Sequence, residues 1–114
     1  MKVIKKQTDK RGRIMIIEDD GWEYHLVKTF AGKYRGGEIH DEPQFNLVVR
    51  GEVEFIYKLA GEQHQVVGCG KVISIPPGVP HMSLSLTDSV VLEWHKAGRK
   101  TEYYEPFRGK VVNQ

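Results

Sequence analysis

The chain has 114 residues, of which 39% are hydrophobic and 28% charged, and its formal net charge is +2. This balance predicts a single folded domain and excludes the clustered basic excess of a nucleic-acid-binding protein. No apolar run approaches the roughly 18 residues that a membrane-spanning helix needs, and the basic start lacks the apolar stretch of a secretory signal. The single cysteine, Cys69, excludes an internal disulfide and is typical of the reducing cytoplasm.

Short strand-like segments follow one another along the chain, separated by turn residues. The first covers residues 13–17, and the second, 22–30, begins after the turn dipeptide Asp20-Gly21. Later segments cover residues 44–49, 52–59, 64–67, 71–75 and 89–94. This pattern predicts an all-β sandwich or barrel, with at most one helical turn within residues 101–109. The apolar strand 13–17 could pair with a second copy of the chain, which predicts a homodimer.

Alternation within two strands predicts which side chains face inward. In residues 22–30 the more apolar face carries Trp22, Leu26 and Phe30 and is expected to point inward. Lys28 shares that face, so it is either a pocket residue with a chemical role or a lysine whose stem reaches the barrel mouth. In residues 90–95 the same argument turns Glu93 outward, and His25 is expected at the surface or a sheet edge.

Two spaced sets of residues carry the candidate chemistry. The first follows the spacing G-x5-E-x-H-x3-Q-x6-G and places Glu38, His40 and Gln44 on one face of an extended chain. The second follows the spacing G-x5-P-P-G-x2-H, in which a turn fixes the backbone before His81.

The two sets resemble the motifs of the cupins, G-x5-H-x-H-x3-4-E-x6-G and G-x5-P-x-G-x2-H-x3-N, over residues 32–51 and 70–85. This sequence departs from them where Glu38 replaces a histidine, Gln44 replaces a glutamate and Ser85 replaces an asparagine. The resemblance implies a single-domain double-stranded β-helix, a jelly-roll barrel, with a central metal ion. Carried over by position, its ligands are Glu38, His40, Gln44 and His81.

The ion implied by this donor set is a divalent transition metal such as Zn, Mn, Fe or Ni. Two alternatives stay open. The histidines could be buried structural residues of a barrel that has lost its ion, and Glu38 could be an acid or base beside a three-ligand site.

A Lewis-acidic ion beside a titratable side chain suits isomerase or epimerase chemistry, with Lys28 and Glu38 as the first candidates for proton transfer. Residues 34–40 are similar to the corresponding segment in cupins of sugar and nucleotide-sugar metabolism. This similarity implies a sugar-like or sugar-acid small molecule, with Tyr34, Arg35 and Ser83 as substrate contacts. Arg35 could instead be a rim residue. A metal-dependent oxygenase, or a module that binds a small ligand without turnover, are the alternative functions.

Overall fold

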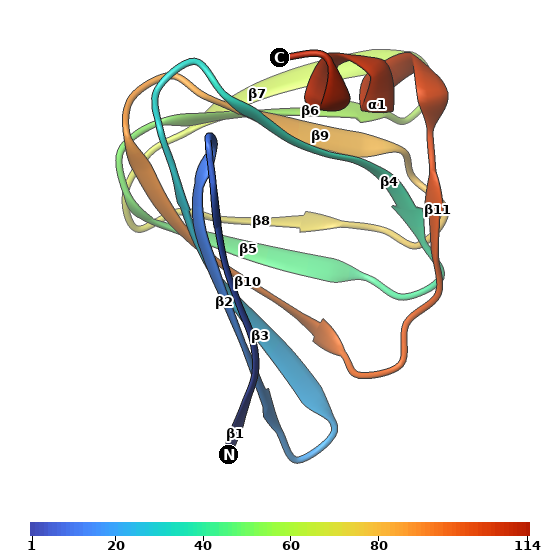
Figure 1. Ribbon diagram of the computed structural model, residues 1–114. Helices are drawn as coiled ribbons and strands as arrows, with labels where there is room; N and C mark the ends of the chain where they lie inside the picture. Colours follow the sequence, from blue (N-terminus) through green and yellow to red (C-terminus); the bar gives the residue numbers. More distant parts are fainter.

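The computed structural model describes residues 1–114 and contains two antiparallel sheets that face each other (Figure 1). The larger sheet has six strands in the order β1-β2-β3-β10-β5-β8. Its strands are β1 (Lys2–Asp9), β2 (Gly12–Asp19), β3 (Trp22–Thr29), β10 (Ser89–Lys96), β5 (Gln44–Arg50) and β8 (Val72–Ile75).

The smaller sheet has five strands in the order β11-β4-β9-β6-β7. Its strands are β11 (Thr101–Tyr103), β4 (Tyr34–His40), β9 (His81–Ser85), β6 (Val53–Lys58) and β7 (Glu62–Val67). One helix, α1 (Glu105–Val112), follows β11 and lies beside this sheet (Figure 1). At eight residues, α1 is far too short to be a membrane-spanning helix.

This architecture confirms the all-β prediction, and two local predictions change. The segment 13–17 belongs to β2, which pairs with β1 and β3 and therefore has no free edge. One edge strand of this sheet is β1, which sequence reasoning missed because its lysines mask the alternation. The segment 101–109 forms β11 and then more than the single helical turn expected.

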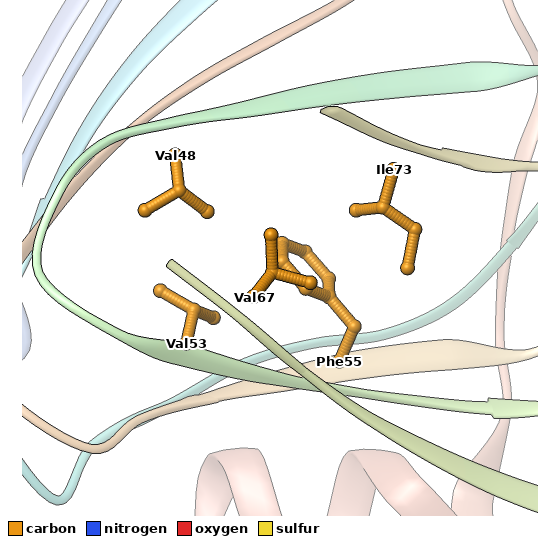
Figure 2. Packing of buried hydrophobic residues seen from close by; sticks show 5 residues of the cluster. All are labelled: Val48, Val53, Phe55, Val67 and Ile73. Carbon is orange, nitrogen blue, oxygen red and sulfur yellow. The ribbon is translucent and has the colours of Figure 1, made fainter. Parts of the chain in front are cut away.

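Eight of the twelve buried apolar residues form two separate clusters. The first lies between the sheets and contains five buried side chains, shown in Figure 2: Val48, Val53, Phe55, Val67 and Ile73. The second joins Ile56, Met82 and Phe107 and fixes α1 against the five-stranded sheet. Elsewhere the inner faces are polar, with buried Thr29, His40, Gln44, Asn46, His81, Ser85, Ser89 and His95.

The inward face of β3 is the reverse of the predicted one. Val27 and Thr29 are 7% and 4% exposed, whereas Leu26 and Phe30 are 39% and 45% exposed. The prediction was wrong because it placed the more apolar face inside, and here the inner face lines a polar cavity. On β10 the same inversion turns Glu93 toward that cavity.

Candidate functional site

The two sheets enclose a cavity of about 440 Å³. Its wall carries more positive than negative side chains: Lys5, Arg11, Arg35, Arg99 and Arg108 against Glu38 and Glu93. A cavity of this size holds a small organic molecule. Since the cations outnumber the carboxyl groups, the cavity favours an anionic ligand.

A β-bulge in β4 turns two charged residues into the cavity. Arg35 and Glu38 are three residues apart, so a regular strand would place them on opposite faces. Both line the cavity because the pairing with β9 slips between Gly36 and Glu38. Gly36 and Gly37 permit the slip with positive φ angles of 95° and 78°.

Gln44 on β5 and His81 on β9 bring their side chains together from opposite sheets. The His81 Nε2 atom lies 3.1 Å from Gln44 Oε1, and His81 Nδ1 lies 3.0 Å from the carbonyl oxygen of Val79. Gln44 Nε2 donates to Asn46 Oδ1, so its Oε1 atom is the acceptor that faces His81.

A neutral His81 cannot satisfy both of its neighbours. Its ring carries one proton, so either Nδ1 or Nε2 must face an acceptor without a hydrogen between them. Burial lowers the pKa of His81 and so opposes a second proton on the ring. A cation bound by His81 Nε2 and Gln44 Oε1 would resolve this conflict.

His40 supplies another nitrogen without a partner. Its Nδ1 atom lies 2.8 Å from Thr101 Oγ1, while its Nε2 atom is buried and has no hydrogen-bond partner. Burial, and then the positive charge of Arg99, lower the pKa of His40 to about 2, so the ring is neutral. The His40 and His81 rings lie 5.0 Å apart between centroids.

Glu38 completes the predicted set at a longer distance. Its Oε1 atom is 3.8 Å from His40 Nε2. Burial, and then the charge of Glu93, raise the pKa of Glu38. Glu38 thus lies near His40, and Gln44 lies near His81. The unpartnered His40 nitrogen and the conflict at His81 are each the kind of feature that a bound cation would satisfy.

Arg99 is the neighbour that sequence reasoning missed. Its Nη1 atom donates to Gln44 Oε1 at 3.1 Å, and its Nη2 atom donates to Glu93 Oε1 at 3.2 Å. Arg99 follows β10 and belongs to neither motif, so only the fold reveals its place. Glu93 was predicted to face outward and instead forms an ion pair with Arg99 at the cavity wall.

The other predicted site residues fall in different places. Arg35 and Ser83 line the cavity, whereas Tyr34 packs against the cluster under α1. The Lys28 side chain is exposed on the outer face of β3 and does not line the cavity. Only its backbone oxygen reaches the site, where it accepts a hydrogen bond from Arg35.

A second group of potential metal ligands lies on β3 and β10. It consists of Glu23, His25 and His95, whose ligand atoms all lie within 4.8 Å of one another. His25, predicted at the surface or an edge, lines the cavity. The sequence pattern did not predict this cluster, because 70 residues separate the two histidines.

Comparison with solved structures places the fold. The chain aligns with oxalate decarboxylase from Bacillus subtilis, solved at pH 4.6, with 16% identity and a TM-score of 0.76 over 82% of this chain and 27% of that one. It aligns with CapF, solved with the inhibitor 3-isopropenyl-tropolone, with 20% identity and a TM-score of 0.78 over 89% of this chain and 33% of that one. The chain has the fold of the cupins.

The motif residues lie on strands of both sheets of this barrel. Glu38 and His40 lie on β4, Gln44 begins β5 and His81 begins β9. The sequence itself matches no family model and no curated protein. The chain spans about a third or less of the length of the solved structures that it matches.

Proposed function

We propose that this cupin binds a divalent transition metal and isomerises or epimerises an anionic, sugar-like small molecule. The observation that carries the proposal is the buried His40 Nε2 atom, which has no hydrogen-bond partner, lies 3.8 Å from Glu38 Oε1 and belongs to a ring 5.0 Å from that of His81. Glu38 and His81 line the arginine-lined cavity. When bound, such an ion polarises a carbonyl or hydroxyl group of the substrate.

The cavity wall would orient the anionic part of the substrate. Arg35 donates from Nε to Thr29 Oγ1 at 2.7 Å and from Nη2 to the oxygen of Lys28, so its guanidinium group is fixed in place. Burial, and then the charge of Arg11, lower the pKa of Arg35 to about 10, and it remains positive at neutral pH. A fixed guanidinium binds a carboxylate or phosphate through paired hydrogen bonds.

Glu38 is the proposed proton-transfer group. A carboxyl group with a raised pKa exchanges a proton near neutral pH more readily than an ordinary glutamate. Its position on the cavity wall, next to His40, brings it close to a substrate held there. Because Lys28 points outward, it has no part in this proposal.

A metal-dependent oxygenase is the second candidate. Two imidazoles and one carboxylate, from His40, His81 and Glu38, form the donor set that non-haem iron prefers. The anionic preference of the cavity would also suit a small dicarboxylate such as oxalate, the substrate named for one of the structural neighbours.

Metal analysis of the purified chain tests the proposal. We expect the double variant His40→Ala/His81→Ala to lose one equivalent of bound metal relative to the parent. Equal metal content in the two proteins would overturn the ligand assignment. Assay of the metal-loaded parent against sugar phosphates, uronic acids and oxalate, with oxygen consumption recorded, distinguishes isomerase from oxygenase. A parent that binds these anions without turnover would be a binding module.

Glu38→Gln separates the two roles that Glu38 could have. This change keeps the shape of the side chain and removes its ability to carry a proton between substrate atoms. We expect the variant to retain its metal and to lose turnover at least a hundredfold, the usual scale of general acid–base catalysis. Loss of the metal as well would make Glu38 a ligand rather than the proposed base.

The homodimer stays a proposal that depends on β1. This edge strand exposes Val3 and Ile4, which are 49% and 42% exposed. Its outer edge has no strand partner, although lysines and a bulge between Val3 and Lys5 discourage pairing. Size-exclusion chromatography at several concentrations tests it, and a monomer throughout would contradict it.

A further inference from the structure

The cluster of Glu23, His25 and His95 lies outside both cupin motifs and outside the proposed catalytic group. Glu23 and His25 lie on β3, and His95 lies opposite Glu23 in the antiparallel pairing with β10. The His95 side chain is 2% exposed, and those of His25 and Glu23 are 15% and 20% exposed. Three potential ligands are thus held by the rigid backbone of one strand pair.

The hydrogen bond made by His95 Nδ1 leaves a lone pair on His95 Nε2, which faces His25 and Glu23. His95 Nδ1 lies 2.7 Å from the backbone oxygen of Lys96, so this nitrogen carries the ring proton. Burial lowers the pKa of His95 and keeps the ring neutral. Its Nε2 atom therefore carries a lone pair, which can accept a hydrogen bond from His25 Nε2 at 3.1 Å or bind an ion in its place. The Lys96 carbonyl fixes the ring as backbone carbonyls do for metal-bound histidines.

The distances within the cluster match those around a single ion. His95 Nε2 and His25 Nε2 are 3.1 Å apart, His25 Nε2 and Glu23 Oε1 are 3.3 Å apart, and His95 Nε2 and Glu23 Oε1 are 3.7 Å apart. Ligands at 2.0–2.1 Å from a tetrahedral zinc ion lie about 3.3 Å from one another. An ion could enter with only small movements of the side chains.

We propose that Glu23, His25 and His95 form a second metal site that binds a divalent transition ion of the zinc type. Two imidazoles and one carboxylate provide three ligands and leave a fourth position open. Since His25 lines the cavity, this open position is near the interior of the barrel. The site shares no ligand with the predicted motif site on β4, β5 and β9.

Stoichiometric titration of the full chain with Zn²⁺, and with Co²⁺ as a coloured probe, tests this site. We expect His25→Ala to bind one equivalent fewer than the parent while its circular dichroism is unchanged. We expect His40→Ala/His81→Ala to retain the equivalent bound by this cluster. Glu23→Gln preserves the volume of the side chain and should weaken the binding of the same metal equivalent at least tenfold. This variant tests the site if His25→Ala does not fold.

His64→Ala provides the matched control. His64 is an exposed imidazole whose nitrogens lie 2.7 Å from Glu62 and 3.4 Å from Glu54, so it reports adventitious binding by a surface histidine. We expect its stoichiometry to equal that of the parent. Unchanged stoichiometry in both His25→Ala and Glu23→Gln would overturn the proposal. So would a folded His40→Ala/His81→Ala variant that binds no ion, and neither result depends on the motif site being occupied.

Discussion

The structure contains two pairs of imidazoles with nearly the same ring geometry and different origins. The rings of His40 and His81 lie 5.0 Å apart at 54°, and those of His25 and His95 lie 5.0 Å apart at 59°. In each pair a backbone carbonyl binds one Nδ1 atom. Beside the motif pair lie the amide of Gln44, the guanidinium of Arg99 and the carboxylate of Glu38, whereas the other pair has the carboxylate of Glu23 in hydrogen-bond range of His25.

The difference shows what a spacing motif can and cannot encode. Residues 38, 40 and 44 are close in sequence, so their spacing predicts a common face. The His25–His95 pair depends on the register of β3 with β10, which no local pattern specifies. The following predictions separate the two pairs, from the largest expected effect to the smallest.

Gly37→Ala should disturb β4, and with it the His40–His81 pair, and should leave the His25–His95 pair unchanged. A Cβ atom at Gly37 would lie 2.6 Å from Arg108 Cα, at a φ of 78°. We expect the free energy of unfolding to fall by about 3 kcal/mol or more, from backbone strain together with the clash. Gly61→Ala is the matched control, because Gly61 also has a positive φ but no neighbour within 4 Å.

Urea denaturation of both glycine variants measures this difference. The control should lose only about 1–2 kcal/mol, the cost of a left-handed conformation. Equal losses in the two variants would show that the contact between β4 and α1 does not support the bulge.

Acid should destabilise the metal-free protein through its buried imidazoles. The pKa of His40 falls from 6.5 in the unfolded chain to about 2 in the fold, so below pH 6.5 the unfolded state binds more protons. Stability therefore falls as the pH falls, by about 2 kcal/mol from His40 alone between pH 7 and pH 5. His81 and His95 act in the same direction.

Glu38 acts in the opposite direction. Its raised pKa makes the folded state bind more protons just above pH 4.5, so its contribution is lost as the pH rises through the folded pKa. Urea denaturation in chelator at several pH values checks the balance. His40→Gln should flatten the slope between pH 6.5 and pH 5, and an unchanged slope would mean that His40 titrates normally.

Thr101→Val should weaken metal binding at the motif pair alone. Thr101 Oγ1 lies 2.8 Å from His40 Nδ1 and fixes the orientation of that ring. Loss of such a partner lowers metal affinity about 10- to 100-fold. Competition with a chelating dye measures it, and an equal loss at the His25–His95 pair would contradict the assignment.

Arg99→Met should strengthen metal binding at the motif pair. The Arg99 guanidinium contacts Gln44 Oε1 at 3.1 Å, where its positive charge opposes a cation. Removing it should raise the affinity roughly tenfold at the effective dielectric of a partly buried site. The same variant should bind anions more weakly, and isothermal titration with each ligand tests both effects. Weaker metal binding would instead make Arg99 a support for Gln44.

The sequence predicted the barrel well, and failed where the interior is polar. Strand boundaries follow local turn residues, so most strands were located. The inward faces of β3 and β10 were assigned wrongly because Leu26 and Trp94 made the outer faces look like core. In a barrel with a cavity, polar residues such as His25 and Glu93 face inward and form the cavity wall. An assignment that turns the more hydrophobic face of a strand inward is therefore wrong here.

The N-terminal hairpin supplies part of the cavity wall, and its residues can change independently of the buried core. Lys5 and Gln7 on β1 line the cavity, yet β1 pairs only with β2 and adds no residue to the buried apolar clusters. Substitutions at these two positions would change which molecule is accommodated and leave the packed interior intact. When the protein adapts to a new ligand, packing therefore constrains substitutions least at the cavity positions of the first strand.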